Sequence, residues 1–322
     1  MSGDDTIVLT CASDEGYAPY ATTMLLSALE NTPRTRFRVY YLCTPDFSTH
    51  SQALIRQSLR AFQARLELNF VPVPDALVAG LPLFKTMKAG EIRPVMWYRV
   101  FLPRLLPDEP KILYLDCDIL VVGSLVPLWR TALAGKALAA VTNPFWDSPA
   151  ELAWASRCGL ARREDYFNSG VMLLNLDWWR REEVTAKVIA HGLANADWTR
   201  FGDQDSLVAV LYAARLPLAP RWNAMRMLMM ADQSRVIFSA EELHEAIRHP
   251  AIIHFEGSTK PWVDPGKHPY GRLHARYARR LPWPVAHTPW TLLDLENLLT
   301  RLDWPRLRAR VRRLRQRLAA RA

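Results

Sequence analysis

Short apolar runs alternate with helical patterns in the N-terminal part of the chain, and this alternation constrains the fold more than any other feature. Apolar runs over Ile7–Cys11, Arg38–Cys43 and Leu66–Val71 predict buried strands. Helical spacing over Tyr20–Asn31, and again from Leu54 to Phe62, separates these runs with short connections. Strands and helices that alternate in this way form parallel sheets with helices on both faces. The predicted fold class is therefore α/β.

The same kind of pattern continues to about Gly271. Further strands are predicted at Lys111–Leu115, Ala137–Thr142, Val171–Leu176 and Ala251–Phe255. Further helices are predicted at Trp97–Leu106, Trp178–Ala194 and Asp205–Ala213, and residues 72–94 are predicted to form a loop. Beyond Gly271 arginine becomes frequent and tryptophans recur, so we place one catalytic domain at 1–270 and a basic, Trp-rich tail at 271–322.

Composition excludes several classes of protein. A chain with 50% hydrophobic and 23% charged residues is globular rather than disordered. No run of 18 apolar residues occurs, and the N-terminus MSGDDTIVL lacks the basic flank of a secretory signal. The four cysteines lie far apart without a C-x-x-C pair, which argues against a zinc knuckle or a disulfide framework. We therefore expect a protein of a reducing compartment, the cytoplasm.

The net charge of +9 is concentrated in the tail. The last 22 residues contain nine arginines and one aspartate, a net charge of +8, so the other 300 residues carry only +1. No basic face is therefore expected on the body, and nucleic acid is not a predicted partner. Apolar residues of the tail recur at spacings of three and four, at Trp304, Leu307, Val311, Leu314 and Leu318.

This stripe predicts an amphipathic, basic helix. Dense arginine favours contact with an anionic membrane surface, whose lipid phosphates relieve the repulsion between like charges. Peripheral attachment to the inner face of the cytoplasmic membrane follows as the predicted localisation. The alternatives are a coiled-coil seam and packing of the helix on the body.

Two aspartates directly after a buried strand are the first candidate for chemistry. Asp116 and Asp118 follow Lys111–Leu115, and this spacing in extended backbone puts both carboxylates on one side of the chain. The carboxyl ends of parallel strands are where open α/β folds bind ligands. Paired carboxylates suit Mg²⁺ or Mn²⁺, and the alternative is a solvated turn. The chain has neither a G-x-G-x-x-G nor a G-x-x-x-x-G-K-[ST] motif, so a metal would have to hold the phosphates of any bound nucleotide.

Several segments, in order, resemble glycosyltransferase family eight, the retaining enzymes that include bacterial lipopolysaccharide galactosyl- and glucosyltransferases. They are LYLDCDILVVGSLVPLW, the loop Asp14–Tyr17, WYRVFLPRLLP, YFNSGVMLLNLDWWR, Asp203–Asp205 and HFEGSTKPW. The resemblance covers roughly residues 7–270. It implies the GT-A nucleotide-diphospho-sugar transferase fold, with a central mixed sheet covered by helices on both faces. The basic helical tail predicted from the arginine-rich C-terminus lies beyond the part that the resemblance covers.

The resemblance assigns a third metal ligand and two diphosphate contacts. It makes His254 a ligand beside Asp116 and Asp118, and one imidazole among oxygens favours Mn²⁺, with Mg²⁺ as the alternative. It places Gly257 and Lys260 against the β-phosphate. The residues alone leave open that His254 is a core histidine and that Lys260 is a surface lysine.

The resemblance also assigns residues that hold the donor nucleotide. These are Ala12, Asp14, Tyr17, Arg99 and Cys117. Asp14 is expected to contact ribose or uracil, and the ring of Tyr17 is expected to stack on the base. Two alternatives remain open: Asp14 caps the next helix, and Arg99 pairs with a helix carboxylate.

The remaining assignments concern the sugar. Asn168 lines the donor sugar by resemblance, and turn formation is its alternative role. Asp203, Gln204 and Asp205 are the catalytic block: Asp203 binds sugar hydroxyls, and Gln204 lies beneath the anomeric carbon. Helix capping by Asp203 is the alternative.

The resulting hypothesis is retaining, Mn²⁺-dependent transfer of galactose or glucose from UDP-galactose or UDP-glucose to a saccharide acceptor such as lipopolysaccharide, lipooligosaccharide or another surface glycan. Two departures from the family pattern bear on substrate choice: Gly16 stands where a polar residue is common, and Asn143 stands where galactosyltransferase-like members carry Asp. Two alternative functions remain. One is a nucleotidyltransferase that activates a sugar phosphate, and the other is a non-catalytic protein that binds glycan or membrane.

Overall fold

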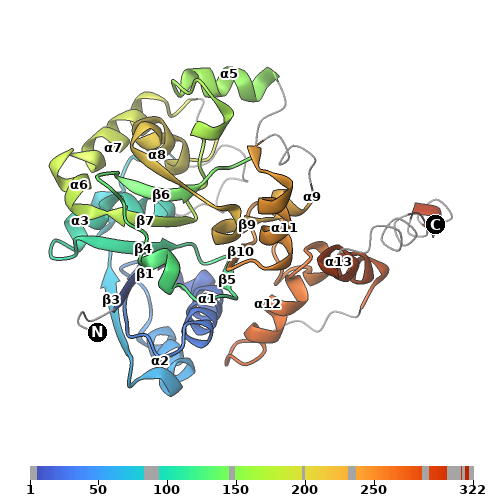
Figure 1. The fold of residues 1–322 in the computed structure, drawn as a ribbon. Helices are drawn as coiled ribbons and strands as arrows, with labels where there is room; N and C mark the ends of the chain where they lie inside the picture. The colour runs from blue at the N-terminus through green and yellow to red at the C-terminus, as the bar shows by residue number, and fades with distance from the viewer. Residues whose placement is uncertain are drawn as a thin grey trace.

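The computed structural model describes residues 6–82, 94–144, 149–197, 200–230, 237–284, 290–302, 313 and 316–318. It has a mixed central sheet with helices on both faces, so the α/β fold class is confirmed (Figure 1).

The main sheet has seven strands in the order β3-β2-β1-β4-β7-β6-β8. Their bounds are β1 Ile7–Ser13, β2 Phe37–Cys43, β3 Leu66–Pro72, β4 Lys111–Leu115, β6 Leu138–Val141, β7 Val171–Asn175 and β8 Arg215–Leu218. β1, β2, β3 and β4 are parallel, as the alternating pattern predicts. β7 runs antiparallel to both β4 and β6, and this reversal makes the sheet mixed.

Alternate residues of the central strands enter different cores. Along β1, Ile7 and Leu9 pack with α1 (Ala18–Asn31) and α2 (Thr49–Ser58), whereas Val8 packs on the opposite face with Trp97 and Trp179. This two-residue period is that of a strand buried on both sides. Figure 1 shows α1 and α2 on one face of the sheet and α6, α7 and α8 on the other.

The other helices frame the sheet. Their bounds are α3 Leu102–Leu105, α4 Val126–Trp129, α5 Pro149–Arg157, α6 Leu176–Arg181, α7 Val184–Ala194, α8 Asp203–Leu211, α9 Arg226–Met230, α11 Ala240–Arg248, α12 Gly271–Ala278 and α13 Leu292–Leu302. Two predicted helices differ in detail. The segment expected as one helix at Trp97–Leu106 is a 3₁₀ helix over Pro94–Phe101 followed by α3. The helix expected at Trp178–Ala194 is interrupted at Glu183, whose φ of 52° breaks the helical path between α6 and α7.

A second, three-stranded sheet lies beside the main one. It has the order β5-β10-β9, with β5 Ile119–Val121, β9 Ala224–Met225 and β10 Ile252–His254. The strand predicted at Ala251–Phe255 therefore exists, as β10, but belongs to this small sheet. Because β4 lies in the main sheet and β5 in the small one, the turn that joins them spans the junction.

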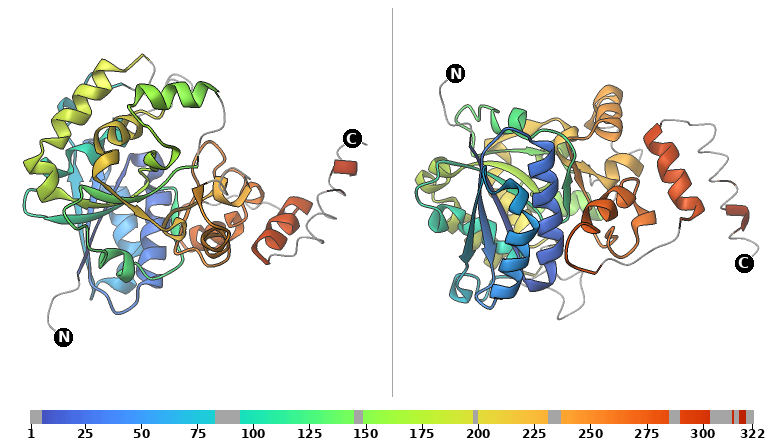
Figure 2. Two further views of the ribbon diagram at one scale, coloured as in Figure 1. Left: turned by 45° about the horizontal axis from the view of Figure 1, so that its top comes forward. Right: turned by 90° about the horizontal axis from the view of Figure 1, so that it is seen from below.

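The C-terminal helices α12 and α13 pack at the edge of the body (Figure 2). Asn31 of α1 donates a hydrogen bond to the hydroxyl of Tyr277, 2.9 Å away. Arg272 binds the buried carboxylate of Asp294, with 2.7 Å between Nε and Oδ1, and so ties α13 to α12. The domain boundary near residue 271 stays a prediction. Of the predicted amphipathic tail helix, Trp304, Leu307, Val311 and Leu314 lie outside the described residues, and Leu318 is exposed within a short helical stretch.

Among the residues that the structure describes, no helix combines the length and the apolar character needed to span a bilayer. Of the 72–94 segment predicted as loop, residues 75–77 form a 3₁₀ turn, and residues 83–93 lie outside the described ranges.

Candidate active site

The turn from Asp116 to Asp118 is fixed at both ends by neighbouring strands. The backbone N–H of Asp116 donates to the carbonyl oxygen of Gly170, next to β7, at 2.8 Å. The carbonyl oxygen of Asp118 accepts from the N–H of Phe255, next to β10, at 2.9 Å. The two aspartates are therefore held between the main sheet and the small sheet.

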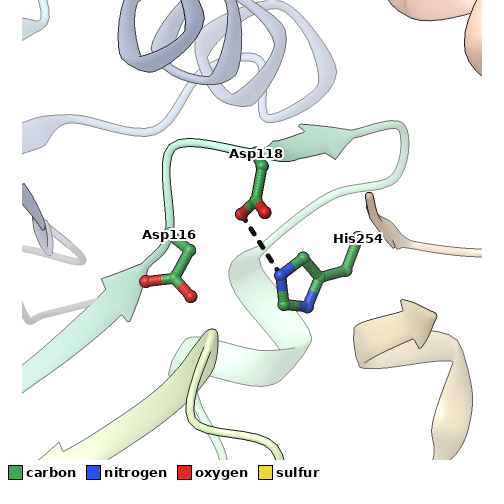
Figure 3. A group of neighbouring side chains, drawn as sticks. All are labelled: Asp116, Asp118 and His254. Carbon is green, nitrogen blue, oxygen red and sulfur yellow. Dashed lines mark ion pairs between the residues drawn. The ribbon is translucent and has the colours of Figure 1, made fainter. Parts of the chain in front are cut away.

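Asp116, Asp118 and His254 converge at this junction (Figure 3). One potential ligand atom from each lies within 4.8 Å of the others. His254 is the last residue of β10 and is buried, and its Nε2 lies 3.2 Å from Oδ1 of Asp118. We call these three residues the Asp-Asp-His cluster.

Lys260 and His254 both lie against the carboxylate of Asp118. Lys260 Nζ binds its Oδ2 and also donates to the carbonyl oxygen of Phe255 at 2.9 Å. Burial would raise the pKa of Asp118, but the charges of Lys260 and His254 outweigh it and hold the pKa well below its usual range. Burial would likewise lower the pKa of His254, but Asp118 and Asp116 outweigh it, so this pKa is raised. Lys260 is thus a partner of the cluster, and its interpretation as a surface lysine is wrong.

The donor set and its surroundings fit a divalent metal ion. Two carboxylates and one imidazole are ligands that Mg²⁺ and Mn²⁺ accept. The backbone leaves room beside them because residue 170 is glycine. A Cβ on Gly170 would project into the His254 ring and lie only 2.8 Å from Oδ2 of Asp116. Asp116, Asp118 and His254 could therefore hold such an ion.

Arg99 links the Asp-Asp-His cluster to the start of α8. Its buried guanidinium donates from Nη1 to Oδ1 of Asp116 at 3.0 Å and from Nη2 to Oδ1 of Asp203, also at 3.0 Å. Burial would lower the pKa of Arg99, but Asp203 and Asp116 outweigh it and raise the pKa. Arg99 pairs with a helix carboxylate, that of Asp203, and its predicted contact with the donor nucleotide stays a prediction.

Asp203, Gln204 and Asp205 form the first turn of α8 and are all buried; we call them the α8 cluster. The N-cap position is occupied by Gly202, with a φ of 56°, and no side chain caps this helix. The capping interpretation of Asp203 is therefore wrong. Its carboxylate instead points to Arg99.

The amide of Gln204 is held at both ends. Its Oε1 accepts from the backbone N–H of Ser169 at 2.9 Å and from the Ser169 hydroxyl at 3.0 Å. Its Nε2 donates to the hydroxyl of Tyr166 at 2.7 Å. Because a backbone N–H can only donate, the orientation of this amide is fixed.

Asp205 belongs to the same hydrogen-bond network, through the hydroxyl of Tyr166. Tyr166 donates its hydroxyl to Oδ1 of Asp205 at 2.9 Å. Oδ2 accepts from the backbone N–H groups of Arg200 and Phe201, at 2.7 and 2.9 Å. Burial raises the pKa of Asp205 to about 6, because it outweighs these hydrogen bonds.

The predicted nucleotide-binding residues lie around the end of β1. The carbonyl oxygen of Ala12 accepts from Sγ of Cys117 at 3.0 Å, so these two residues are adjacent. Asp14 accepts from the backbone N–H of Tyr17 at 3.0 Å and caps the 3₁₀ turn Glu15–Tyr17 that precedes α1, whereas no side chain caps α1 itself. The predicted contact of Asp14 with the nucleoside stays a prediction. The ring of Tyr17 is 42% exposed and packs edge-on against Trp262, with 6.0 Å between centroids.

The loop after β10 brings its residues to the same place. Gly257 has a φ of 77°, a conformation that favours glycine. Lys260 follows three residues later, and its Nζ lies 5.8 Å from the centre of the Trp262 ring. The loops after β1 and β10 therefore meet beside Asp118.

The side-chain oxygen of Asn168 is bonded within the protein, and the predicted contact of Asn168 with the donor sugar stays a prediction. Its Oδ1 accepts from the backbone N–H of Gly170 at 2.9 Å and from Nδ2 of Asn223 at 2.8 Å. The first bond confirms the turn-forming role. Sequence reasoning missed Tyr166 and Ser169, although both belong to the YFNSGV segment, and it missed Asn223, which no motif marks.

The model of the family described as glycosyl transferase family 8 matches residues 8–266. The chain belongs to glycosyltransferase family 8. Among solved structures, the galactosyltransferase LgtC in complex with donor and acceptor sugar analogues superposes with a TM-score of 0.73. It is 26% identical, and the match covers 86% of this chain and 97% of LgtC. The family, the GT-A fold and glycosyltransferase activity are thereby shown, and the non-catalytic alternative is set aside.

Two bacterial proteins are among the sequence relatives. General stress protein A of Bacillus subtilis is 26% identical over 294 residues, which cover 90% of this chain and 99% of that protein. Glycosyltransferase GlyB of Streptococcus pneumoniae is 32% identical over 229 residues, 69% of this chain and 50% of GlyB.

Proposed function

We propose that this family 8 glycosyltransferase moves galactose or glucose from a UDP-sugar to a saccharide acceptor, with retention of the α configuration and with Mn²⁺ at the Asp-Asp-His cluster. One observation carries the proposal. Arg99 binds both Asp116, in the Asp-Asp-His cluster, and Asp203, in the α8 cluster. The first cluster has the ligands of a divalent metal site, and in the second the orientation of the Gln204 amide is fixed by hydrogen bonds.

The Asp-Asp-His cluster is the proposed diphosphate site. A bound divalent ion would stabilise the negative charge of the leaving UDP. Lys260 is already placed at Asp118 and would add a second positive charge. Gly257 lies in the same loop, where a backbone without a side chain can approach phosphate oxygens closely. Asp14 and Tyr17 are the proposed contacts of the nucleoside.

Gln204 is proposed to face the sugar from the side opposite the diphosphate. An amide is a weak nucleophile, so we favour front-face displacement: the bond from the anomeric carbon to the diphosphate breaks, and the acceptor oxygen bonds on the same face. The acceptor hydroxyl passes its proton to the departing phosphate oxygen. Gln204 stabilises the developing positive charge of the sugar, and Asp203 binds sugar hydroxyls.

The proposed acceptor is lipopolysaccharide or another surface glycan. The likeness to LgtC, whose structure contains donor and acceptor sugar analogues, supports a nucleotide-sugar donor and a sugar acceptor. The nine arginines after residue 300 support peripheral attachment to the anionic inner face of the cytoplasmic membrane. A chain that ends after Leu302 keeps α13 and should lose sedimentation with anionic liposomes at low salt. Equal sedimentation of the two chains would contradict tail-mediated attachment.

The function is tested by incubation with UDP-galactose, UDP-glucose and other UDP-sugars in the presence of Mn²⁺, with free UDP as the readout. We expect release from one of the first two donors, and loss of release in EDTA. NMR of the glycoside product should show an α linkage. A β-linked product would contradict retention, and undiminished release in EDTA would contradict the metal requirement.

A further inference from the structure

Three buried hydrogen bonds run from the backbone of Gly170, which directly precedes β7, to the ring of His254. Gly170 N–H donates to Oδ1 of Asn168 at 2.9 Å, and Nδ2 of Asn223 donates to the same oxygen at 2.8 Å. Oδ1 of Asn223 then lies 3.0 Å from Nδ1 of His254. Asn223 is 0% exposed and His254 3% exposed, so water does not offer either side chain an alternative partner.

The direction of every bond in this chain follows from its first member. A backbone N–H can only donate, so the Asn168 atom that faces Gly170 is the carbonyl oxygen. The Asn223 atom that shares this oxygen must also be a donor and is therefore the amide nitrogen. The other end of the Asn223 amide, its oxygen, then faces the imidazole and accepts a hydrogen bond from it.

Nδ1 of His254 consequently carries a proton, and the other ring nitrogen faces the carboxylates. Nε2 lies 3.2 Å from Oδ1 of Asp118 and is the atom available as a metal ligand. We propose that Asn223 is a positioning residue that orients His254 and keeps Nε2 directed at the metal ion. This proposal rests on the metal site proposed above.

The backbone supports this placement. Asn223 directly precedes β9, and β9 pairs in parallel with β10, so that Ala224 lies opposite Ile253 and Met225 opposite His254. Asn223 is thereby held beside His254 by strand pairing. Histidine ligands in metal sites commonly donate their second nitrogen to an oxygen of this kind, and its loss typically lowers metal affinity about 10–100-fold.

Two substitutions separate positioning from packing. Asn223→Leu removes the acceptor while filling the space with an apolar side chain. Asn223→Asp keeps an oxygen toward Nδ1 but buries a charge next to Oδ1 of Asn168. If Asn223 only supported the fold, Asn223→Asp would weaken Mn²⁺ binding at least as much as Asn223→Leu. If Asn223 positions His254, Asp preserves metal binding even where it lowers stability.

The experiment measures Mn²⁺ alone, without nucleotide, by calorimetry and by pulsed EPR, in which a coordinated imidazole gives a ¹⁴N modulation. We expect Asn223→Leu to bind Mn²⁺ about 10–100-fold more weakly and to lose the modulation. Asn223→Asp should retain the modulation. Asn175→Leu is the matched control, because the Asn175 amide caps α6 far along β7, and its loss should lower stability but leave Mn²⁺ affinity unchanged.

The proposal is overturned if folded Asn223→Leu keeps both wild-type affinity and the ¹⁴N modulation. Asn223→Ala replaces Asn223→Leu, with the same expected results, if the leucine variant does not fold. Asp118→Ala separates the two levels of inference. If it too binds Mn²⁺ as the wild type does, the metal site itself is wrong. If only Asp118→Ala loses Mn²⁺, the metal site stands and positioning by Asn223 is wrong.

Discussion

The Asp-Asp-His cluster and the α8 cluster lie on either side of Arg99, and they differ in how their polar groups are satisfied. Asp203, Gln204 and Asp205 bond to buried protein groups: the Arg99 guanidinium, Ser169, Tyr166 and two backbone N–H groups. Asp118 instead pairs with the terminal ammonium group of Lys260, which comes from the loop after β10, and with His254.

This difference suits two different tasks. A group that acts on developing charge in the sugar is most effective when it is already oriented, because no reorganisation is then needed during the reaction. A group that must admit a metal ion and a diphosphate needs partners that can be exchanged. The α8 cluster has the features of the first kind of site, and the Asp-Asp-His cluster those of the second.

The largest loss of activity is expected from a substitution in the Asp-Asp-His cluster, whose partners must be exchanged for a metal ion and a diphosphate. Asp118→Ala should lower UDP release about 1000-fold or more, equivalent to about 4 kcal/mol of barrier, because it removes a proposed metal ligand. Circular dichroism should show the fold intact. Asp177→Ala, which removes an exposed carboxylate paired with Arg180 on α6, is the control and should keep full activity. Wild-type activity in Asp118→Ala would remove the basis for a metal-dependent cluster.

Removal of the Arg99 charge, which pairs with the α8 cluster, should lower the free energy of unfolding. Arg99→Met leaves the buried carboxylate of Asp203 without its partner, and we expect a loss of about 3–5 kcal/mol in the free energy of unfolding. Arg181→Met removes an exposed pair with Glu182 and should cost less than about 1 kcal/mol. Both values come from urea denaturation. Similar losses in the two variants would show that Arg99 is not the organising charge.

Asp205 gives the fixed side a pH dependence. Its pKa is raised by burial from 3.8 to about 6, so its contribution to stability is fully present below pH 3.8 and is lost as the pH rises through about 6. The unfolding free energy of the wild type relative to Asp205→Asn should fall by about 2.4 kcal/mol between pH 4 and pH 7.

Asp294 provides the control for this measurement. Burial would raise its pKa, but Arg272 and Thr291 outweigh burial and lower the pKa, so its titration lies below this window. The difference between the wild type and Asp294→Asn should not fall from pH 4 to pH 7, and it should rise by less than about 1 kcal/mol as the unfolded carboxyl deprotonates. The absence of a fall for Asp205→Asn would mean that the Asp205 carboxyl is not desolvated in the fold.

Gln204→Ala tests whether the α8 cluster acts on the reaction and not on nucleotide binding. UDP release should slow about 100-fold, or about 2.7 kcal/mol, while UDP affinity in Mn²⁺ stays within about threefold of the wild type. This split is expected of a group that acts on the transition state. A loss confined to UDP affinity would place Gln204 on the nucleotide instead.

Local segments explain what the sequence could predict. Asp116 and Asp118 directly follow β4, and His254 lies within the short motif that also carries Lys260, so both parts are visible as continuous patterns. The bonds between the two clusters cannot be predicted from such patterns, because Arg99 and Asp203 are 104 residues apart. The sequence also does not predict the exact backbone conformation of either segment. A 3₁₀ helix carries Arg99, and Gly202 at the N-cap frees Asp203 from capping.

The arrangement of the strands shows the same limit. Alternation of strand and helix gives the parallel order of β1 to β4, but nothing in Val171–Asn175 marks β7 as antiparallel. That reversal carries Gly170 to Asp116 and Asn168 to Asn223, so the contacts around His254 could not be read from the chain.

The most direct test of the contrast between the two clusters is a crystal structure of the wild type with Mn²⁺ and UDP, with the metal located by its anomalous scattering. The anomalous peak should mark an Mn²⁺ ion that Asp116, Asp118 and His254 coordinate directly. Lys260 should have left Asp118 for the diphosphate, while the bonds of Arg99 to Asp203 and of Gln204 to Ser169 and Tyr166 remain as they are here. A metal bound elsewhere, or an α8 cluster that rearranges while Lys260 stays on Asp118, would contradict it.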